Sequence, residues 1–337
     1  MATISDVARE AQVSVATVSR VLNKQDSVKK ATADRVYAAI EKLKFEPNIL
    51  ARNFRRSESR VILIIAPNIT NPYYSHILTG IGDTANELGY SALIFNTANS
   101  EEREKEGMEM LKKRRADGAI LLARNQGSQW LEEYAENYPV VQCSEYDPDV
   151  PFPHVSIDNY KAVREVMAYL FALGHERIAT ISSKNRYIST DLRMKAYKDA
   201  LGEEGLPVEE NLVAYAGLDY SFRSGKEAAE KLLAQENRPT AIFCISDTIA
   251  LGAIAAAMEK GIRVPEDLTV IGFDDVEDTM MFHPYITTVG QPCYELGKNA
   301  MRMLYDRING QLDPQHEMVL KHKFIIRESA GRRKQDD

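Results

Sequence analysis

The sequence predicts an α/β protein in which a small N-terminal helical head precedes a larger body built on parallel sheets. Apolar residues in the first part of the chain recur at the helical spacing i, i+3, i+4 and i+7, with no strand pattern between them. From Val61 onward, short β-rich apolar runs alternate with amphipathic helices, which is typical of parallel α/β architecture. One ordinary sheet needs fewer such units, so we expect two lobes in the body.

The sign of the net charge changes at the same position, near residue 60. Residues 1–60 contain 12 Lys or Arg and 7 Asp or Glu, a net charge of +5, while the whole chain carries −7. The rest of the chain therefore carries −12. A positively charged head can approach phosphate, whereas an acidic body should repel it. This asymmetry favours a nucleic-acid partner for the head.

The cysteines favour a reducing compartment. Cys143, Cys244 and Cys293 are far apart and show no CxxC spacing, which argues against a disulfide framework and against a structural zinc site. No basic segment followed by an apolar stretch opens the chain, and no run of about 18 apolar residues occurs in it. We therefore expect a cytoplasmic protein that does not associate with membranes.

Three short helices are expected in the head. Thr3 and Ser14 are candidate N-caps in front of two apolar stripes, and a third helix is predicted from Lys30 to Leu43. Pro47-Asn48 marks the end of this helical region. The predicted head core consists of Ile4, Val7, Ala8, Ala11, Val18, Val21, Leu22, Val36, Ile40 and Leu43.

The apolar runs of the body predict its strands. Helical patterns fill most of the gaps between these runs, and no internal repeat is visible. The predicted strands are residues 61–66, 91–95, 118–122, 140–143, 155–157, 177–181, 241–244 and 268–272.

The segments Thr3 to Ala8 and Val13 to Asn23 closely resemble the head of the lactose/galactose repressor (LacI/GalR) family. A helical hairpin alone is a weak signal. Because this match is long and nearly unbroken, it favours a helix-turn-helix. The resemblance implies a transcriptional regulator of the repressor type that binds a pseudo-palindromic operator in double-stranded DNA as a homodimer.

Burial of Val18 and Val21 should turn the start of the second helix outward, where side chains reach base edges in the major groove. Arg20 is the predicted base reader, because its guanidinium can make two hydrogen bonds to guanine; a phosphate contact is the alternative. Val15 and Ala16 offer only apolar contact. The other expected DNA-binding residues of the head are Thr3, Ser14, Thr17, Ser19 and Asn23, and the last three should position the helix on the phosphate backbone.

Residues 47–56 resemble the hinge of the family, a helix that forms on DNA when two subunits pair. The family usually has Leu at the position of Phe54, and this side chain enters the minor groove and kinks the duplex. The alternative is a basic linker with Phe54 packed on the core. The expected DNA-binding residues of the hinge are Asn48, Ala51, Arg52, Phe54 and Arg55.

The resemblance covers essentially the whole chain and implies the two-lobed fold of periplasmic sugar-binding proteins, with an effector held between the lobes. The expected domains are residues 1–46, 47–60 and 61–337. The body would consist of one lobe at 61–157 and 291–320 and another at 158–290 and 321–330. The effector-binding residues that the resemblance implies are Asn71, Tyr73, Tyr74, Arg193, Tyr220, Ser246 and Asp274, and most of them lie in loops beyond the carboxyl ends of parallel strands, where ligands of such sheets bind.

The class of effector stays open between a sugar and a nucleoside. Ser246 replaces an Asn that is frequent in the family, and Cys293 replaces an aromatic residue common in sugar sensors. Residues 252–253 and 291–297 are most similar to the cytidine-repressor branch, which implies a nucleoside as the alternative. We expect no cofactor, no metal ion and no catalytic residue, and nothing in the sequence supports a protein coregulator. The absence of apolar heptads at the end of the sequence predicts a dimer.

Two other classes of protein are alternatives. An α/β enzyme acting on sugars or nucleosides would leave residues 1–60 unexplained, and a nonspecific DNA-binding protein would leave the acidic body unexplained. Residues 80–85 imitate the dinucleotide-binding fingerprint GxGxxG/A, but they fall inside a predicted helix instead of directly after a strand. We expect Gly80 and Gly82 to serve close packing of that helix.

Overall fold

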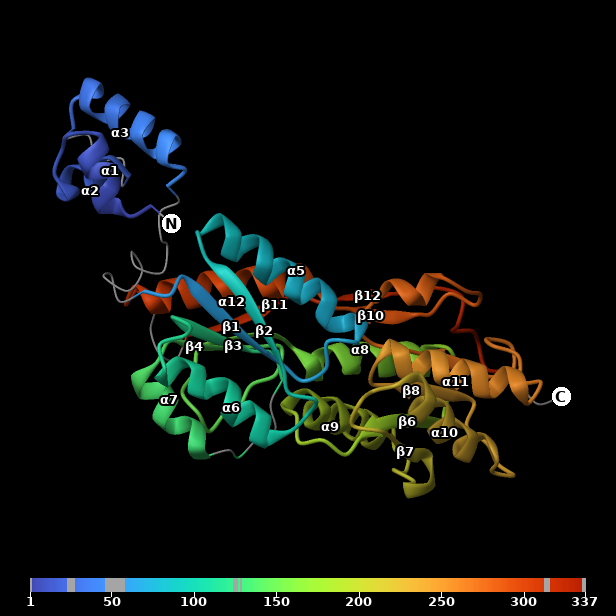
Figure 1. Cartoon of the computed structure of the whole chain (residues 1–337). Coiled ribbons are helices and arrows are strands. Elements are labelled where there is room, and N and C mark those ends of the chain that lie inside the picture. The colour runs from blue at the N-terminus through green and yellow to red at the C-terminus, as the bar shows by residue number, and fades with distance from the viewer. Residues whose placement is uncertain are drawn as a thin grey trace. The chain divides into compact units, whose positions relative to one another are not determined.

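The computed structural model of the protein describes residues 2–22, 28–45, 58–123, 127, 129–311 and 316–334. The chain forms two compact units that divide between Ser59 and Arg60. The first unit is the head and the second is the body, whose elements run from β1 to β12 (Figure 1).

The head contains the three expected helices, α1 (Ile4–Glu10), α2 (Val15–Leu22) and α3 (Lys30–Leu43). Two of the predicted core residues of α3, Ile40 and Leu43, are only partly buried, because the helix turns Ala39 toward the core instead. The residues fully buried in this small core are Val7, Ala8, Ala11, Val18, Val21, Val36 and Ala39.

The first lobe of the body is built on a six-stranded sheet with the strand order β11-β5-β4-β3-β1-β2, and every neighbouring pair is parallel. Helices α5 and α12 lie over one face of this sheet, and α6 and α7 lie over the other (Figure 1). The strands are β1 (Val61–Ala66), β2 (Ser91–Asn96), β3 (Gly118–Leu121), β4 (Val140–Cys143), β5 (His154–Ile157) and β11 (Glu317–Leu320), and the helices are α5 (Pro72–Glu87), α6 (Glu101–Lys112), α7 (Glu132–Asn137) and α12 (Cys293–Ile308).

The second lobe contains a four-stranded parallel sheet with the order β7-β6-β8-β9. Helix α8 packs on α9, and α10 packs on α11. The strands are β6 (Ile178–Ser183), β7 (Val213–Ala216), β8 (Ala241–Cys244) and β9 (Thr269–Ile271), and the helices are α8 (Asn159–Ala172), α9 (Ile188–Glu203), α10 (Phe222–Leu233) and α11 (Asp247–Glu259).

The chain passes between the lobes more than once. It leaves the first sheet after β5 and returns to it through α12 and β11. Two short strands, β10 (Thr288–Gly290) and β12 (Lys323–Ile325), form an antiparallel pair next to these passages. Because both sheets are parallel, loops at the carboxyl ends of their strands can gather the side chains of a binding site.

Candidate functional site

Side-chain caps fix the start of the first two helices of the head. Thr3 accepts a hydrogen bond from the backbone N–H of Asp6, and the Asp6 carboxylate accepts one from the N–H of Thr3, which makes a capping box. Ser14 Oγ accepts a hydrogen bond from the N–H of Thr17 at 3.1 Å. Both predicted N-caps are therefore confirmed. They determine where α2 begins and which of its side chains face outward.

The start of α2 presents small and charged side chains to solvent. Val18 and Val21 are 0% and 3% exposed. Their burial turns Val15, Ala16 and Arg20 to the exposed side of the helix, which is the orientation that a helix needs to read base edges in the major groove. Of the other expected contacts, Thr3 and Ser14 are exposed, and Thr17 and Ser19 are half-buried.

The remaining expected DNA contacts lie outside the described residues. In the helix-turn-helix, this applies to Asn23. In the hinge, it applies to all five expected contacts: Asn48, Ala51, Arg52, Phe54 and Arg55.

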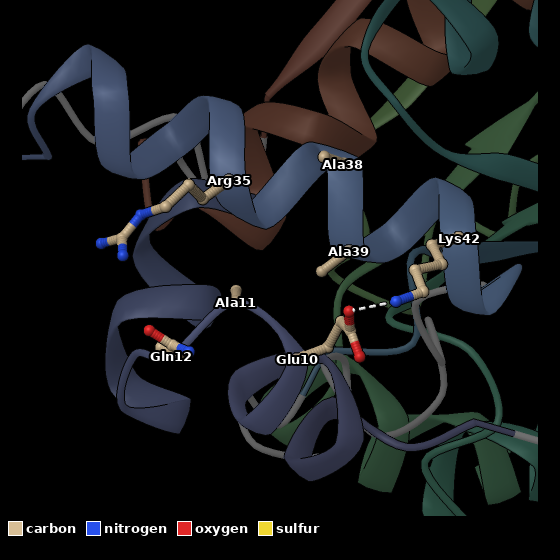
Figure 2. A pocket seen from close by; sticks show the side chains of 7 residues that line it. All are labelled: Glu10, Ala11, Gln12, Arg35, Ala38, Ala39 and Lys42. Atoms are coloured by element: carbon tan, nitrogen blue, oxygen red, sulfur yellow. Dashed lines mark hydrogen bonds and ion pairs between the residues drawn. The ribbon is translucent and has the colours of Figure 1, made fainter.

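A hollow of about 340 Å³ lies between the end of α1 and one side of α3 (Figure 2). Lys42 Nζ and Glu10 Oε1 lie 2.6 Å apart within it, whereas Arg35 points away from this pair. No residue expected to bind DNA lines the hollow. Its lining consists of Glu10, Ala11, Gln12, Arg35, Ala38, Ala39 and Lys42.

In the body, a chain of hydrogen bonds links the two lobes. Tyr73 lies in the first turn of α5 and is buried. Its hydroxyl pairs with Ser144 Oγ and donates to Gln291 Oε1 at 3.1 Å. Gln291 Nε2 donates in turn to Asp274 Oδ1 at 2.8 Å. A tyrosine of the first lobe is thereby joined to an acid that follows the last strand of the second sheet.

Asp274 is held in an unfavourable environment and conformation. Its φ is 120°, in the region that favours glycine, so the surrounding structure must impose it. Burial raises the pKa of Asp274 well above its ordinary value, and the nearby Arg193 guanidinium opposes this shift. Strained, buried carboxyl groups of this kind are concentrated at functional sites.

Asp247 braces the segment that carries Asp274. Its carboxylate accepts hydrogen bonds from Thr288 Oγ1 at 2.6 Å and from the N–H of Val276 at 3.0 Å. Burial raises the pKa of Asp247 to about 6, against the effect of these two hydrogen bonds. A Cβ at Gly272 would lie 2.2 Å from Asp247 Oδ1, so the backbone passes directly over this carboxylate.

Arg193 projects from α9 and is 6% exposed. Its Nε donates to Asn159 Oδ1 at 2.9 Å, and Nη1 donates to the carbonyl of Ile245 at 2.6 Å. The guanidinium lies 3.6 Å from the centroid of the Phe273 ring. A buried cation is thus fixed beside Asp274 by neutral groups.

Two further predicted tyrosines lie near this cluster. The Tyr220 hydroxyl accepts from Asn185 Nδ2 at 2.6 Å and pairs with Thr190 Oγ1 at 3.1 Å. Tyr74 packs edge-on against Tyr73 with 5.1 Å between ring centroids. The Tyr74 side chain is 7% exposed, and burial raises the pKa of its hydroxyl well above the ordinary value.

Asn71 and Ser246 have local roles in the structure. Asn71 caps α5 by accepting from the N–H of Tyr73 at 3.0 Å, and Ser246 caps α11 by accepting from the N–H of Ile249. Each cap also places its helix N-terminus at the carboxyl end of a strand. The positive end of a helix dipole there suits a polar ligand.

Sequence reasoning missed several residues that join the two lobes. Ser189, at the start of α9, donates both its N–H and its hydroxyl to the Glu145 carboxylate of the first lobe, and burial raises the pKa of Glu145. Tyr187 donates across the lobes to Asn99 Oδ1 at 3.1 Å. Glu145 and Asn99 follow β4 and β2, so their position at strand ends was the available signal.

The glycines of the imitated fingerprint have different roles. A Cβ on Gly80 would lie 2.2 Å from the Tyr294 carbonyl of α12, which confirms close helix packing there. A Cβ on Gly82 would meet nothing within 4 Å, so the packing interpretation was wrong for this residue.

The described residues contain no group of three or more His, Cys, Asp or Glu side chains that could hold a metal ion. Among the same residues, no helix is long and apolar enough to cross a membrane.

Comparison with protein families finds two matches. Residues 59–328 match the family described as periplasmic binding proteins and sugar binding domain of LacI family. Residues 3–48 match the family described as bacterial regulatory proteins, lacI family.

Individual relatives match nearly the whole chain. The HTH-type transcriptional repressor CytR of Escherichia coli (strain K12) is 38% identical over 330 residues, which cover 98% of this chain and 96% of that protein. Catabolite control protein A of Priestia megaterium is 36% identical over 330 residues, covering 97% and 99%. Among solved structures, the lac repressor dimer bound to operator and the anti-inducer ONPF has a TM-score of 0.88 at 27% identity, covering 98% of this chain and 99% of that one.

Proposed function

Because the chain belongs to the LacI family of bacterial regulatory proteins, we propose that it binds a pseudo-palindromic operator as a homodimer in the cytoplasm and is controlled by a small molecule held between its lobes. Family membership confirms the predicted fold class and the prediction of a transcriptional regulator that is not an enzyme. The operator, the effector and the roles of single residues belong to the proposal.

The observation that carries the DNA-binding proposal is the orientation of α2. Val18 and Val21 are buried, while Val15 and Ala16 at the start of the helix and Arg20 in its last turn are exposed. In the proposal, Arg20 reads a guanine, and Val15 and Ala16 make apolar contacts with base edges such as the thymine methyl. Thr17, Ser19 and Asn23 position the helix on the phosphate backbone, and Thr3 and Ser14 are further DNA-binding residues of the proposal.

The hinge is proposed to be residues 47–60, between a helix-turn-helix domain at 1–46 and an effector domain at 61–337. Asn48, Ala51, Arg52 and Arg55 would contact the operator centre, and Phe54 would enter the minor groove there. The run of arginines and one aromatic wedge is the chemistry that such a contact requires.

The effector is proposed to bind among the buried polar groups that join the lobes. Tyr74 packs on Tyr73, and the Tyr73 hydroxyl is linked through Gln291 to Asp274, so a phenol and an acid belong to one hydrogen-bonded group, with the Arg193 cation beside the acid. Hydroxyl-rich ligands suit such a set, because aromatic rings stack on sugar or base faces while acids and arginine bind hydroxyls. A sugar and a nucleoside share this chemistry. Asn71, Tyr220 and Ser246 complete the proposed site.

Exposed apolar side chains in both lobes support the dimer. Leu93 and Ile94 lie on β2, an edge strand of the first sheet, and are 42% and 46% exposed. In the second lobe, Met280, Met281 and Phe282 follow one another, and Phe282 is 75% exposed. Clustered apolar surface of this kind marks contacts between proteins.

The test is selection of bound fragments from random DNA with the purified full chain at physiological salt, followed by titration of the best site with pools of sugars and of nucleosides. We expect enrichment of a two-fold symmetric site whose affinity responds to one pool. If no sequence is enriched, the DNA-binding proposal fails. If a site is enriched but neither pool changes its affinity, the proposed effector classes fail.

A further inference from the structure

Four cations follow one another at the end of helix α6, within a part of the chain, residues 61–337, that carries a net charge of −12. The run is Lys112 to Arg115. Lys112 is already neutralised, because its Nζ lies 3.1 Å from a Glu133 oxygen and 3.3 Å from a Glu109 oxygen. Lys113, Arg114 and Arg115 are exposed, and their side chains make no ion pair with any residue that the structure describes.

This cationic run lies at the edge of the body where the chain from the head enters. Strand β3 begins shortly after Arg115 and is parallel to β1, so both strands start at the same edge of the sheet (Figure 1). Asp117 joins the two starts: its N–H donates to the carbonyl of Val61 at 2.8 Å, and its carboxylate accepts from the N–H of Arg60 at 2.9 Å. Arg60 is the first residue of the body.

Stabilisation of the helix does not account for the whole run. Cations near the C-terminus of a helix interact favourably with its dipole, but the effect falls off within the last turn. Helix α6 ends at Lys112 with Lys113 as its C-cap. Lys112 supplies a cation to the last turn, whereas Arg114 and Arg115 lie beyond the cap.

We propose that Lys113, Arg114 and Arg115 form a second, sequence-independent DNA-binding surface, which contacts phosphates of the duplex that the head holds. The proposal rests on the proposed DNA binding of the head. The segment from Phe45 to Arg60 spans at most roughly 50 Å when fully extended, so DNA held by the head stays within reach of this edge. Guanidinium groups suit phosphate contacts, and three adjacent cations give this edge a local positive charge within an otherwise acidic body.

The test compares a variant carrying K113Q, R114Q and R115Q with the wild type on two duplexes, one of minimal operator length and one with long flanks. Each phosphate contact contributes about −0.9 to the slope of log affinity against log salt concentration. On the long duplex we expect the slope to become shallower by up to about 3 per subunit, with a loss of affinity of more than about tenfold. On the minimal operator we expect a smaller change or none.

A matched control carries K198Q, K231Q and K260Q, three exposed lysines of the second lobe, and removes the same charge. It should keep the wild-type slope on both duplexes. The variant R114K and R115K retains the charge and should keep most of the slope. Thermal unfolding of each variant reports whether the substitutions disturb the fold; if the triple variant is unstable, the single variants K113Q, R114Q and R115Q replace it, and each should make the slope on the long duplex shallower by up to about 0.9 per subunit.

Equal slopes for the wild type and the triple variant on the long duplex would overturn the proposal. The next partner to test for these cations would then be an acidic protein. A loss equal in the control variant would also overturn it, because net charge alone would then explain the effect. If the wild type enriches no operator at all, the proposed function fails first and this surface fails with it.

Discussion

In the head, Val15, Ala16 and Arg20, the residues expected to contact bases, are exposed, whereas in the body Tyr73, Arg193 and Asp274, expected to hold the effector, are buried and hydrogen-bonded to other protein groups. Val15 at the start of α2 is 39% exposed, while Arg193 in the body is 6% exposed and donates to two protein groups. A duplex is large and approaches the surface of the head, but a small molecule must enter a site whose groups already satisfy each other.

This difference predicts how substitutions divide between stability and binding. The exposed side chains of α2 that make no cap, such as Val15 and Arg20, can be removed at little cost to the fold, so the loss should appear in DNA affinity. Removal of a buried, bonded side chain leaves its former partners unsatisfied, so the loss should appear first in the free energy of unfolding.

The largest effect should come from the close packing that holds the body's buried residues in place. A Cβ at Gly80 would meet the Tyr294 carbonyl, so G80A should lower the free energy of unfolding of the body by about 3 kcal/mol or more. Chemical denaturation followed by circular dichroism measures this. G82A is the control and should be neutral or stabilising by up to about 1 kcal/mol, because its Cβ meets nothing. Equal losses in the two variants would contradict the packing argument.

Removal of the buried cation should be nearly as costly. R193M leaves Asn159 Oδ1 and the Ile245 carbonyl without a donor and leaves the buried Asp274 beside no cation, so we expect a loss of about 3 kcal/mol in the free energy of unfolding. The exposed Lys195 on the same helix pairs with Asp199, and K195M should barely change the melting temperature. If R193M is as stable as the wild type, the contrast between head and body does not hold.

The pH dependence of stability should have opposite signs in the two units. The folded pKa of Asp247 is about 6, against about 3.9 in the unfolded chain, so the stability that this group contributes is lost as pH rises from about 4 to about 6. The advantage of the wild type over D247N should therefore shrink by about 2 kcal/mol between pH 4 and pH 7. Denaturant titrations of both proteins at several pH values measure it.

In the head, hydrogen bonds from Thr3 lower the pKa of Asp6, so its contribution is present above about pH 4 and is lost at lower pH. A D6N variant should accordingly lose its disadvantage in acid. A constant difference between wild type and D247N across pH would show that Asp247 titrates as in the unfolded chain.

Substitution of Arg20 should have the smallest effect on the stability of the fold and a selective effect on DNA binding. R20A should leave the melting temperature of the protein unchanged, because the side chain is exposed. Binding to the selected operator should weaken by about 1–3 kcal/mol, with relaxed preference at one base pair. Binding assays on single-base operator variants test this. Uniform weakening on all sequences would mean that Arg20 contacts only phosphate.

The elements that sequence reasoning predicted are those with strong local patterns. The bounds of β1, β4 and β8 and of α3 agree with the predicted ranges. The strands β7, β10, β11 and β12 were not predicted: β4 and β8 are just as short but are fully buried, whereas β7, β11 and β12 are partly exposed and β10 has one aliphatic side chain, Val289. Such short segments carry no periodicity of their own and become strands through the partners that the lobes bring to them.

The sequence predicted which segments carry the residues of the candidate effector site, but not which contacts these residues make. Tyr73 and Asp274 could be named because they follow strands. Their link through Gln291 could not, since Tyr73 and Gln291 are 218 positions apart in the sequence. The same holds for the Glu145 to Ser189 pair, which depends on how closely the two lobes approach each other.

The return of the chain to the first lobe has a consequence for biosynthesis. The described core of the head lies within residues 4–45, so its three helices can pack once these residues have been made. The six-stranded sheet, in contrast, lacks its edge strand until Glu317–Leu320 emerges, and Ser329 then bonds to Val270 in the second lobe. A nascent chain on the ribosome therefore exposes a folded, positively charged head for most of its synthesis while both lobes stay unfinished. Its first encounters with nucleic acid precede any possibility of control by an effector.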